Sequence, residues 1–338
     1  MTTKKLTIEQ KYKSMTEVEH ILQKSGMWIG SINKEDKNLY VYDNDNCKMI
    51  MKTVSYIPAV LKLVDEIISN SVDEYRRIDN LGLTNLDVKI DTNGFITIRD
   101  NGGIPVVKHK EAGIYVPTFL FGSLRTSSNY NDDDSRDGVG TNGVGSAITN
   151  VWSTQYEVST ADGKNSYHQT WSNNMNINDD LEIKKCSKKD HYTETKFKLD
   201  FKRLHETVDT CFSEDFINII EKRCIDAAAA NVGLNVHFSY TDNDKVIRES
   251  EWHFKTFDEY IELFTDYVDT EQMLKFSDSI MQVWVFPDNG INVGFVNGAE
   301  CSRGTHIRAV RNEINNAISA YLLSKEKIDI TPKNVDGK

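Results

Sequence analysis

Two stretches of the chain repeat their apolar residues with the period of a helix. The first is TEVEHILQKSGMWIGS, where Val18, Ile21 and Leu22 share one face and Gly26 interrupts the pattern in a turn. The second, YIPAVLKLVDEIISNSVDEYRR, predicts a strongly amphipathic helix, because Pro58 suits a first helical turn and apolar residues recur every three or four positions. Those apolar residues are Ile57, Val60, Leu61, Val64, Ile68, Val72 and Tyr75.

The other face of this second helix is polar. Its side chains follow one another at intervals of three or four residues and are therefore stacked along one side. Simple solvation of an exposed helix face and a functional site are both consistent with this pattern. The residues are Lys62, Glu66, Asn70, Asp73 and Arg77.

Strict alternation of apolar and polar residues follows in LDVKIDTNGFITIRDNGGIP. Asn93 and Gly94 form a tight-turn signal, so the segment predicts a β-hairpin. Strand parity places Asp100 on the same side as Ile96 and Ile98, toward the core. A carboxylate there is costly unless it accepts hydrogen bonds. Asp100 therefore either caps the turn that follows or accepts hydrogen bonds from a ligand amino group.

The run DGVGTNGVGSA is too rich in glycine to be a strand or an ordinary helix. SAITNVWSTQYEVST follows it and predicts a helix and then a strand, which places Gly143 and Gly145 at the helix start. Glycines let backbone N–H groups crowd around an anion, so a phosphate loop and a flexible surface linker are both open. The run lacks the G-K-[ST] ending of a Walker-type loop, and it does not follow the first strand of a βαβ unit.

Composition narrows the class of protein. A chain of 338 residues can bury a full core and by length holds two domains. The net charge of −11 disfavours a chain that grips nucleic acid over most of its surface. The five cysteines form no C-x-x-C pair and the eight histidines no ligand-spaced cluster, which favours a reducing compartment without a zinc site. No signal peptide and no run of about eighteen apolar residues is present.

The last part of the chain predicts a second domain. EWHFKTFDEYIELF, from Glu251, begins a new amphipathic unit. IMQVWVFPDNGINVGFVNGAECSRGTH predicts a hairpin and a loop, and IRAVRNEINNAISAYLLSK predicts a helix.

Taken together, these features resemble the Bergerat, or GHKL, ATP-binding fold of DNA gyrase, the ninety-kilodalton heat-shock chaperones, sensor histidine kinases and MutL. A helix with Glu66 and Asn70, a strand-end Asp100 before GGIP, and a glycine loop occur in that order. Within this superfamily the segments MWIGS, EIISNSVDE, VPTFLFGSLRTSSNYNDDD, TNGVGSAITNVWS and RGTHIRAVRNEI are similar to type IIA DNA topoisomerases. YIPAVLKLVDEIISNSVDE is most similar to the large subunit of T-even phage topoisomerases, whereas TSSNYNDDD is similar to eukaryotic ones.

The resemblance implies an α+β fold, a Bergerat-type sandwich of a mixed sheet with helices on one face. It implies an N-terminal dimerisation arm at 1–30, the ATPase domain at 31–245, and at 246–338 the start of a transducer domain of ribosomal-protein-S5-like type. The implied function is the ATP-hydrolysing gate of a type IIA topoisomerase, which dimerises on ATP to capture a DNA duplex for strand passage.

The resemblance also implies cofactors, partners and a location. The cofactors are ATP and Mg²⁺. The partners are a second copy of the chain in an ATP-dependent homodimer, duplex DNA through the full-length enzyme, and the cleavage and religation domain or subunit, with no membrane. The location is intracellular, in the cytoplasm of a phage-infected host cell, or in the nucleus or cytoplasm if the protein is cellular or eukaryotic-viral.

Position by position, the resemblance implies a role for each site residue. Glu66 is the general base that deprotonates the attacking water, and Asn70 is the Mg²⁺ ligand. Asp100 accepts from the adenine amine, and Thr193 lies near the same base edge. Tyr12 either belongs to a disordered tail or reaches the partner's nucleotide. The residues near the ribose and phosphates are Ser127, Ser128 and Asn129, and those of the phosphate-cradling lid are Asn142, Gly143, Val144, Gly145, Ser146 and Ala147.

Three departures from the family pattern bear on function. DNGGIP is one residue shorter than the usual D-x-G-x-G-I-P, and Ala147 stands where eukaryotic relatives carry a lysine. The family's Q-T-K lysine of the transducer is absent, so the chain is expected to be a fragment that stops inside its second domain. A nucleotide-binding dimerisation module with little hydrolysis therefore stays open, as does a Bergerat-fold chaperone or mismatch-repair ATPase.

Overall fold

The computed structural model describes residues 15–77, 82–124, 145–204, 212–265, 271–278, 281–287, 290–301 and 303–335. The chain forms two compact units, Met1–Val268 and Asp269–Lys338. The sequence placed the boundary at 245/246, which falls at the start of strand β10 (Lys245–Trp252). This strand pairs with the preceding strand of the central sheet and belongs to the first compact unit.

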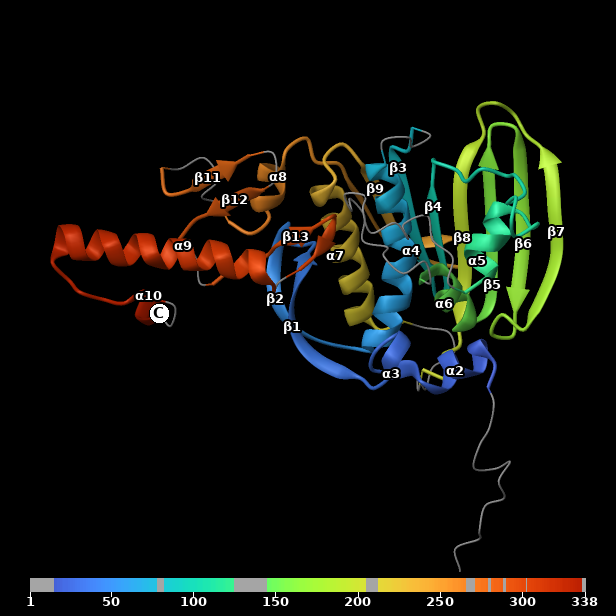
Figure 1. The fold of residues 1–338 in the computed structure, drawn as a ribbon, viewed down its shortest axis with the longest axis horizontal. Coiled ribbons are helices and arrows are strands. Elements are labelled where there is room, and N and C mark those ends of the chain that lie inside the picture. The colour runs from blue at the N-terminus through green and yellow to red at the C-terminus, as the bar shows by residue number, and fades with distance from the viewer. Residues whose placement is uncertain are drawn as a thin grey trace, which may run out of the picture. The chain divides into compact units, whose positions relative to one another are not determined.

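A mixed eight-stranded sheet forms the centre of the first unit (Figure 1). Its strand order is β10-β9-β3-β4-β8-β5-β6-β7. Only the β3–β9 pair, next to the β10 edge, is parallel, and every other neighbouring pair in this sheet is antiparallel. The remaining strands of the sheet are β3 (Asn85–Asp91), β4 (Phe95–Asp100), β5 (Ser153–Asp162), β6 (Asn165–Ser172), β7 (Ile177–Lys185), β8 (His191–Leu199) and β9 (Asn235–Asp242).

Alternating burial shows that one face of the sheet is covered. On β4, Ile96, Ile98 and Asp100 are buried, whereas Arg99 between them is exposed. This is the parity that the sequence predicted for the β3–β4 hairpin, and the Asn93–Gly94 turn joins the two strands as expected. The covering helices lie on the buried face, so the predicted α+β sandwich is confirmed (Figure 1). They are α4 (Pro58–Arg76), α5 (Val116–Gly122), α6 (Gly145–Val151) and α7 (Glu214–Ala230).

Helix α4 is the amphipathic helix that periodicity predicts, with Pro58 in its first turn. Its buried side is wider than the predicted stripe. Leu63 and Ile67 are buried as well, whereas Leu61 and Tyr75 are only half-buried. The reason is that α4 packs against the sheet, α6 and α7 together, so more than one stripe loses its contact with water.

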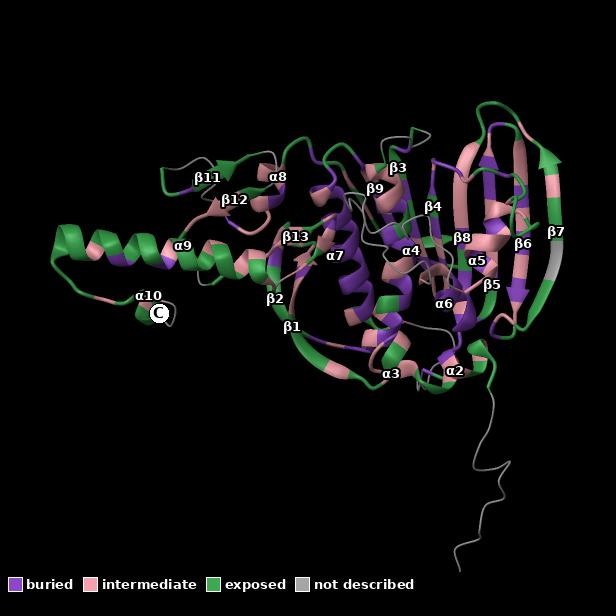
Figure 2. Cartoon of the chain, in the orientation of Figure 1, coloured by how far each residue is buried: buried purple, intermediate pink, exposed green. Residues whose placement is uncertain are grey.

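Helix α7 is buried along nearly its whole length (Figure 2) and carries charged residues into the core. Arg223 donates from Nε to Asp65 of α4 and from Nη2 to the Ser69 hydroxyl at 3.3 Å. Lys222 pairs with Asp226 at 2.6 Å. Buried charges persist only when they are paired. The Lys222–Asp226 pair lies within α7, whereas the Arg223 contacts fix α7 against α4 and thereby position the polar face of α4.

The N-terminal segment adds two short helices and a two-stranded sheet. The predicted helix forms as α2 (Glu17–Gln23), with a capping box between Thr16 and Glu19. A second short helix, α3 (Ser25–Trp28), spans Gly26, where the sequence predicted a turn. The small sheet and the last helix of the unit are β1 (Glu35–Asp43), β2 (Lys48–Tyr56) and α8 (Phe257–Ile261).

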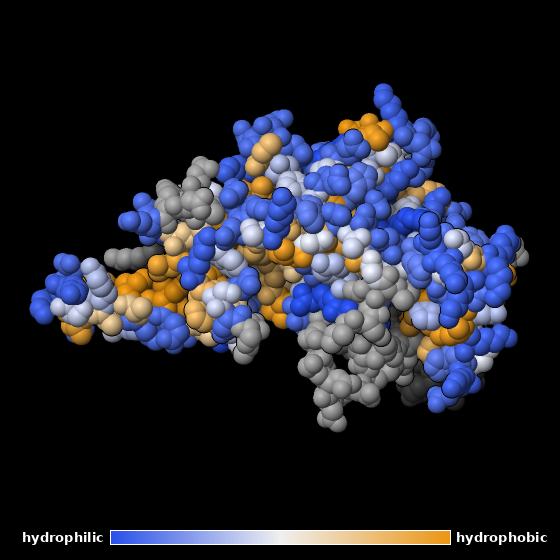
Figure 3. Space-filling view, turned by 90° about the horizontal axis from the view of Figure 1, so that it is seen from above, coloured by the Kyte–Doolittle hydropathy of each residue, from blue (hydrophilic) through white to orange (hydrophobic). Residues whose placement is uncertain are grey.

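The second unit contains short hairpins and one long helix, α9 (Thr305–Tyr321), which confirms the predicted terminal helix. Its strands form two hairpins rather than the single one expected. Leu274, Phe276 and Tyr321 are among the large apolar side chains that the unit exposes. Figure 3 shows hydrophobic surface in orange among the hydrophilic surface in blue. The other elements are β11 (Leu274–Ser277), β12 (Gln282–Val285), β13 (Phe295–Val296), β14 (Ala299–Glu300), the π-helical turn η1 (Leu322–Glu326) and α10 (Pro332–Val335).

Within the described parts of the chain, no helix combines the length and the apolar composition that crossing a bilayer requires.

Candidate active site

The Glu66 carboxylate on α4 lies against the first residue of α6, Gly145. A Cβ at Gly145 would stand 2.9 Å from the Glu66 Cδ atom and would overlap Oε2, so only glycine allows this approach. The other carboxylate oxygen, Oε1, accepts a hydrogen bond from Nζ of Lys62, one turn earlier on α4. The Glu66 carboxylate therefore contacts both α4 and α6. It is not simply solvated on an exposed helix face, which was one of the two interpretations of the sequence pattern.

Asn70 follows Glu66 by one turn and also faces α6. Its Nδ2 donates to the Ser146 hydroxyl at 2.8 Å. Among the residues that the structure describes, none donates to Oδ1 of Asn70, so this neutral oxygen is available to a hard cation. Glu66 and Asn70 therefore present a carboxylate and an amide oxygen on successive turns, beside the start of α6.

Asp100 ends β4 on the buried face. The Ser71 hydroxyl donates to its Oδ2 at 2.7 Å, and the Gly102 backbone N–H donates to Oδ1 at 3.0 Å. Burial raises the pKa of Asp100, an effect that the hydrogen bonds from Ser71 and Gly102 oppose. The turn-capping role is therefore present. The Thr193 backbone also donates to the carboxylate, which with three donors still has a lone pair with which to accept from a ligand.

Thr193 of β8 lies directly opposite Asp100 in the sheet. Its hydroxyl is 3.2 Å from that of Thr160 on β5. The Thr160 hydroxyl also accepts from the Ile104 backbone N–H at 3.0 Å and so ties the GGIP segment to the sheet. Gly103 has φ +125°, and a Cβ there would overlap the Ala161 carbonyl oxygen. Gly103 is thus a packing requirement of the site.

The start of α6 is fixed on α4. The Thr149 hydroxyl donates to the Leu63 carbonyl oxygen at 3.0 Å. Ala147 is buried, so its methyl group packs inside and a ligand contact at this position falls to its backbone. Seven predicted site residues lie outside the described residues: Tyr12, Ser127, Ser128, Asn129, Asn142, Gly143 and Val144.

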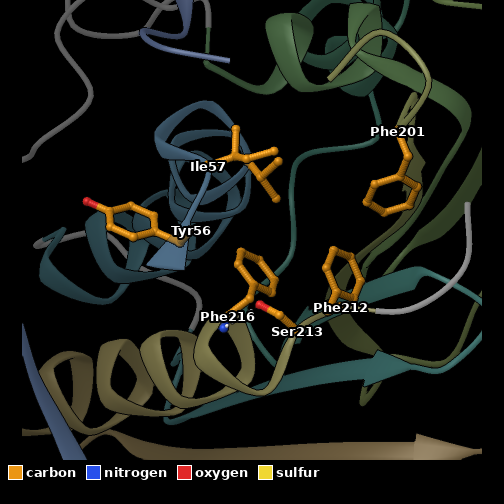
Figure 4. Close-up of a pocket in the computed structure, with 7 residues that line it drawn as sticks. Tyr56, Ile57, Phe201, Phe212, Ser213 and Phe216 are labelled. Atoms are coloured by element: carbon orange, nitrogen blue, oxygen red, sulfur yellow. Dashed lines mark hydrogen bonds between the residues drawn. The ribbon is translucent and has the colours of Figure 1, made fainter. Parts of the chain in front are cut away.

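The structure also has an apolar pocket elsewhere, between the first turns of α4 and α7 (Figure 4). The rings of Phe201 and Phe212 meet edge to face with centroids 5.2 Å apart, and Phe212 stacks on Phe216 at 4.7 Å. The Ser213 hydroxyl accepts from the Phe216 backbone N–H as a helix cap. None of the predicted site residues lines this pocket, whose walls are mainly aromatic and aliphatic.

No group of three or more His, Cys, Asp or Glu side chains within the described ranges is arranged to hold a metal ion. A protein-only metal cage is therefore absent from that part of the chain. Asn70 supplies one neutral oxygen, which suits a cation such as Mg²⁺ that keeps several waters and binds mainly through a ligand's phosphates.

Comparisons with known proteins point in one direction, although no family model matches the chain. The chain is 33% identical over 333 residues to DNA topoisomerase 2 of Arabidopsis thaliana, covering 95% of this chain and 22% of that protein. The fold matches the ATPase region of Saccharomyces cerevisiae topoisomerase II with a TM-score of 0.81 at 29% identity, covering 96% of this chain and 83% of that one. It matches the ATPase and transducer domains of DNA topoisomerase II from Balamuthia mandrillaris with a TM-score of 0.80 at 28% identity, covering 94% of this chain and 80% of that one.

Fold and site together place the chain in a class, the ATPase domains built on a mixed sheet with helices on one face. More particularly, the chain is homologous to the ATPase region of type II DNA topoisomerase, an ATP-hydrolysing enzyme. The resemblance that the sequence motifs suggested is confirmed at this level. The chain spans 22% of the length of the Arabidopsis relative.

Some residues of the site were not predicted as functional. In the sequence, Lys62 belongs to a polar helix face without an assigned role, and no motif singles out Ser71 or Thr160. The spacing of Lys62, four residues before Glu66, is a signal that could have linked the two. The contacts of Ser71 and Thr160 join segments that are distant in sequence, so no local pattern announces them.

Proposed function

We propose that this chain binds ATP together with Mg²⁺ and hydrolyses it, as the nucleotide-operated gate of a type IIA DNA topoisomerase. One observation carries the proposal: three side chains within two turns of α4 meet the other elements of the site. Glu66 and Asn70 contact the start of α6, and Ser71 holds the strand-end Asp100. A single rigid helix thereby connects the base of the reaction to the residue that reads the nucleobase.

Each residue has chemistry that suits its role. Glu66 accepts the proton of the water that attacks the γ-phosphate. Asp100 accepts a hydrogen bond from the exocyclic amine of adenine, with Thr193 beside it across the β4–β8 pair. The family resemblance adds the ribose and phosphate contacts of Ser127, Ser128 and Asn129, and a lid from Asn142 to Ala147.

Asn70 would hold Mg²⁺ through Oδ1. When bound, the cation neutralises phosphate charge during transfer. The protein's contribution is to orient the Asn70 amide, because donation from Nδ2 to Ser146 keeps Oδ1 directed away from α6. This arrangement supports the choice of Asn70 as the metal ligand.

At the level of the whole protein we propose an ATP-dependent homodimer in which Tyr12 of the N-terminal arm reaches the nucleotide of the other copy. Duplex DNA and the cleavage and religation domain or subunit complete the enzyme, which works inside a cell and away from membranes. We also propose three domains: an arm at 1–30, the ATPase domain at 31–245 and the start of a transducer at 246–338. The similarity of motifs such as YIPAVLKLVDEIISNSVDE supports this division and a phage-type origin.

The proposal is tested by separating nucleotide binding from turnover. Glu66→Gln should lower single-turnover hydrolysis about a hundredfold or more and leave binding of a non-hydrolysable ATP analogue unchanged, because the base acts on water. The matched control is Glu74→Gln, two turns later on the same helix and paired with Arg77 at 3.3 Å. Asp100→Ala should instead weaken analogue binding and reduce the preference for ATP over GTP.

Two other outcomes would point to other functions. Tight analogue binding without measurable turnover in the unchanged chain would favour a nucleotide-binding dimerisation module. If the chain hydrolyses ATP but the complete protein does not relax plasmid DNA, a chaperone or mismatch-repair type of ATPase would be favoured. Equal turnover in the Glu66→Gln variant and the unchanged chain would remove Glu66 from the mechanism.

A further inference from the structure

Lys62 touches the carboxylate on which the proposed chemistry depends. Lys62, Glu66 and Asn70 occupy successive turns of α4, so their side chains form a line along one face. Nζ of Lys62 donates to Oε1 of Glu66. The other cation of this face, Arg77, pairs with Glu74 at the far end of the helix. Lys62 is therefore the cation of this face that adjoins the candidate base.

We infer that Lys62 is a positioning residue for Glu66, an inference that rests on the proposed function. Lys62 holds Oε1, while Oε2 occupies the space beside Gly145 that a Cβ at this position would fill. The carboxylate is thereby kept in one orientation, with its position fixed before nucleotide and water arrive.

The physical reason lies in the freedom of a glutamate side chain. Glutamate has three rotatable bonds, and a base that samples several rotamers spends less time in hydrogen-bond reach of the attacking water. Gly145 lies on one side of the carboxylate only, so a rotation away from α6 stays possible unless a second contact opposes it. Lys62 supplies that contact from the preceding turn of the same rigid helix.

The pair is a poor stability element. The Lys62 side chain is 53% exposed and that of Glu66 25% exposed. Water and salt screen such pairs, and many of them contribute nothing measurable to folding. A second pair provides a comparison: Lys52 of β2 and Asp215 of α7 meet at 3.3 Å, with side-chain exposures of 43% and 27%, and neither belongs to the site.

The test is single-turnover hydrolysis by the full chain with Lys62→Met, Lys62→Arg and, as the control, Lys52→Met. We expect Lys62→Met to lower the rate constant at saturating ATP by about threefold to tenfold without changing analogue affinity. Lys62→Arg should restore most of the rate, and Lys52→Met should match the unchanged chain. Added salt should slow the unchanged chain but not Lys62→Met, because the contact is exposed and therefore screened.

Crystal structures supply a readout that is independent of turnover. In Lys62→Met the Glu66 carboxylate should leave its place beside Gly145, and in Lys62→Arg it should stay. An unchanged rate and an unchanged carboxylate in Lys62→Met would overturn the inference. Weaker analogue binding with an unchanged rate at saturation would also overturn it, because Lys62 would then bind the nucleotide directly. If Glu66→Gln is inactive in these cases, the proposed function survives; if Glu66→Gln is fully active, both fall.

Discussion

Asp100 is buried at a strand end and is partnered from two directions. Strand parity alone placed it toward the core, and the structure confirms that placement. The donor that stabilises it, Ser71, lies on a helix that precedes the hairpin, so the hydrogen bond depends on tertiary packing. Sequence therefore predicted the cost of burying this carboxylate but not the group that offsets it.

Asp100 should leave a signature in the pH dependence of stability. Burial raises its pKa above the ordinary value of 3.8. A carboxyl of this kind binds its proton more tightly in the folded state, so its stabilising contribution is complete below the unfolded pKa and is lost as pH rises through the folded pKa. In Asp100→Asn this loss disappears. The free energy of unfolding of the unchanged protein minus that of Asp100→Asn should therefore decrease as pH rises from about 4.

Urea denaturation of both proteins at matched pH values measures this difference. Asp244→Asn is the control with the opposite sign, because a hydrogen bond from Lys89 holds the pKa of Asp244 below its usual value. The corresponding difference for Asp244 should increase with pH. A difference for Asp100 that stays flat or rises would contradict the assigned environment.

At the scale of elements, α4 shows what local pattern predicts and what it leaves out. Its limits, its Pro58 start and its polar face followed from periodicity. Its partners did not, because Arg223 lies 158 residues from Asp65 in sequence and chain patterns carry no information on such pairings. The β3–β4 hairpin was predictable from Asn93 and Gly94, whereas the parallel pairing of β3 with β9 was not.

The link between α7 and α4 should matter for both stability and activity. Arg223→Ala leaves Asp65 and Ser69 without their donor next to the site. We expect the free energy of unfolding to fall by about 1–3 kcal/mol, less than for a fully buried pair because Asp65 is 34% exposed. Turnover should fall as well, since α4 loses a support one residue from Glu66.

Urea denaturation and single-turnover hydrolysis measure the two effects. Arg203→Ala removes an arginine that is half-exposed and paired with Asp200 at 3.1 Å, and it should change both quantities little. Equal effects of the Arg203 and Arg223 variants would show that the α7–α4 link has no special importance.

For the whole molecule, the proposed gate predicts that nucleotide controls association. The chain should sediment as a monomer without nucleotide and as a dimer with a non-hydrolysable ATP analogue and Mg²⁺, because ligand that binds only the closed dimer shifts the equilibrium by mass action. Glu66→Gln should dimerise with ATP itself, since it binds without hydrolysis. Asp100→Ala and Tyr12→Ala should dimerise weakly.

Sedimentation velocity over a range of protein concentrations distinguishes these cases. Association that is the same with and without nucleotide would contradict the proposed gate. Full dimerisation of Tyr12→Ala would remove the arm contact and leave the rest of the proposal intact.

The single parallel pair in the sheet has a consequence for how the protein is made. Asn85 at the start of β3 and Asn235 at the start of β9 are 150 residues apart in the chain, yet they meet side by side. A ribosome delivers β3 long before β9, and until then one edge of β3 has no partner. Pairings of such long range close slowly. A nascent chain stalled before residue 242 thus exposes an open strand edge that lies inside the finished sheet, and such an edge invites aggregation.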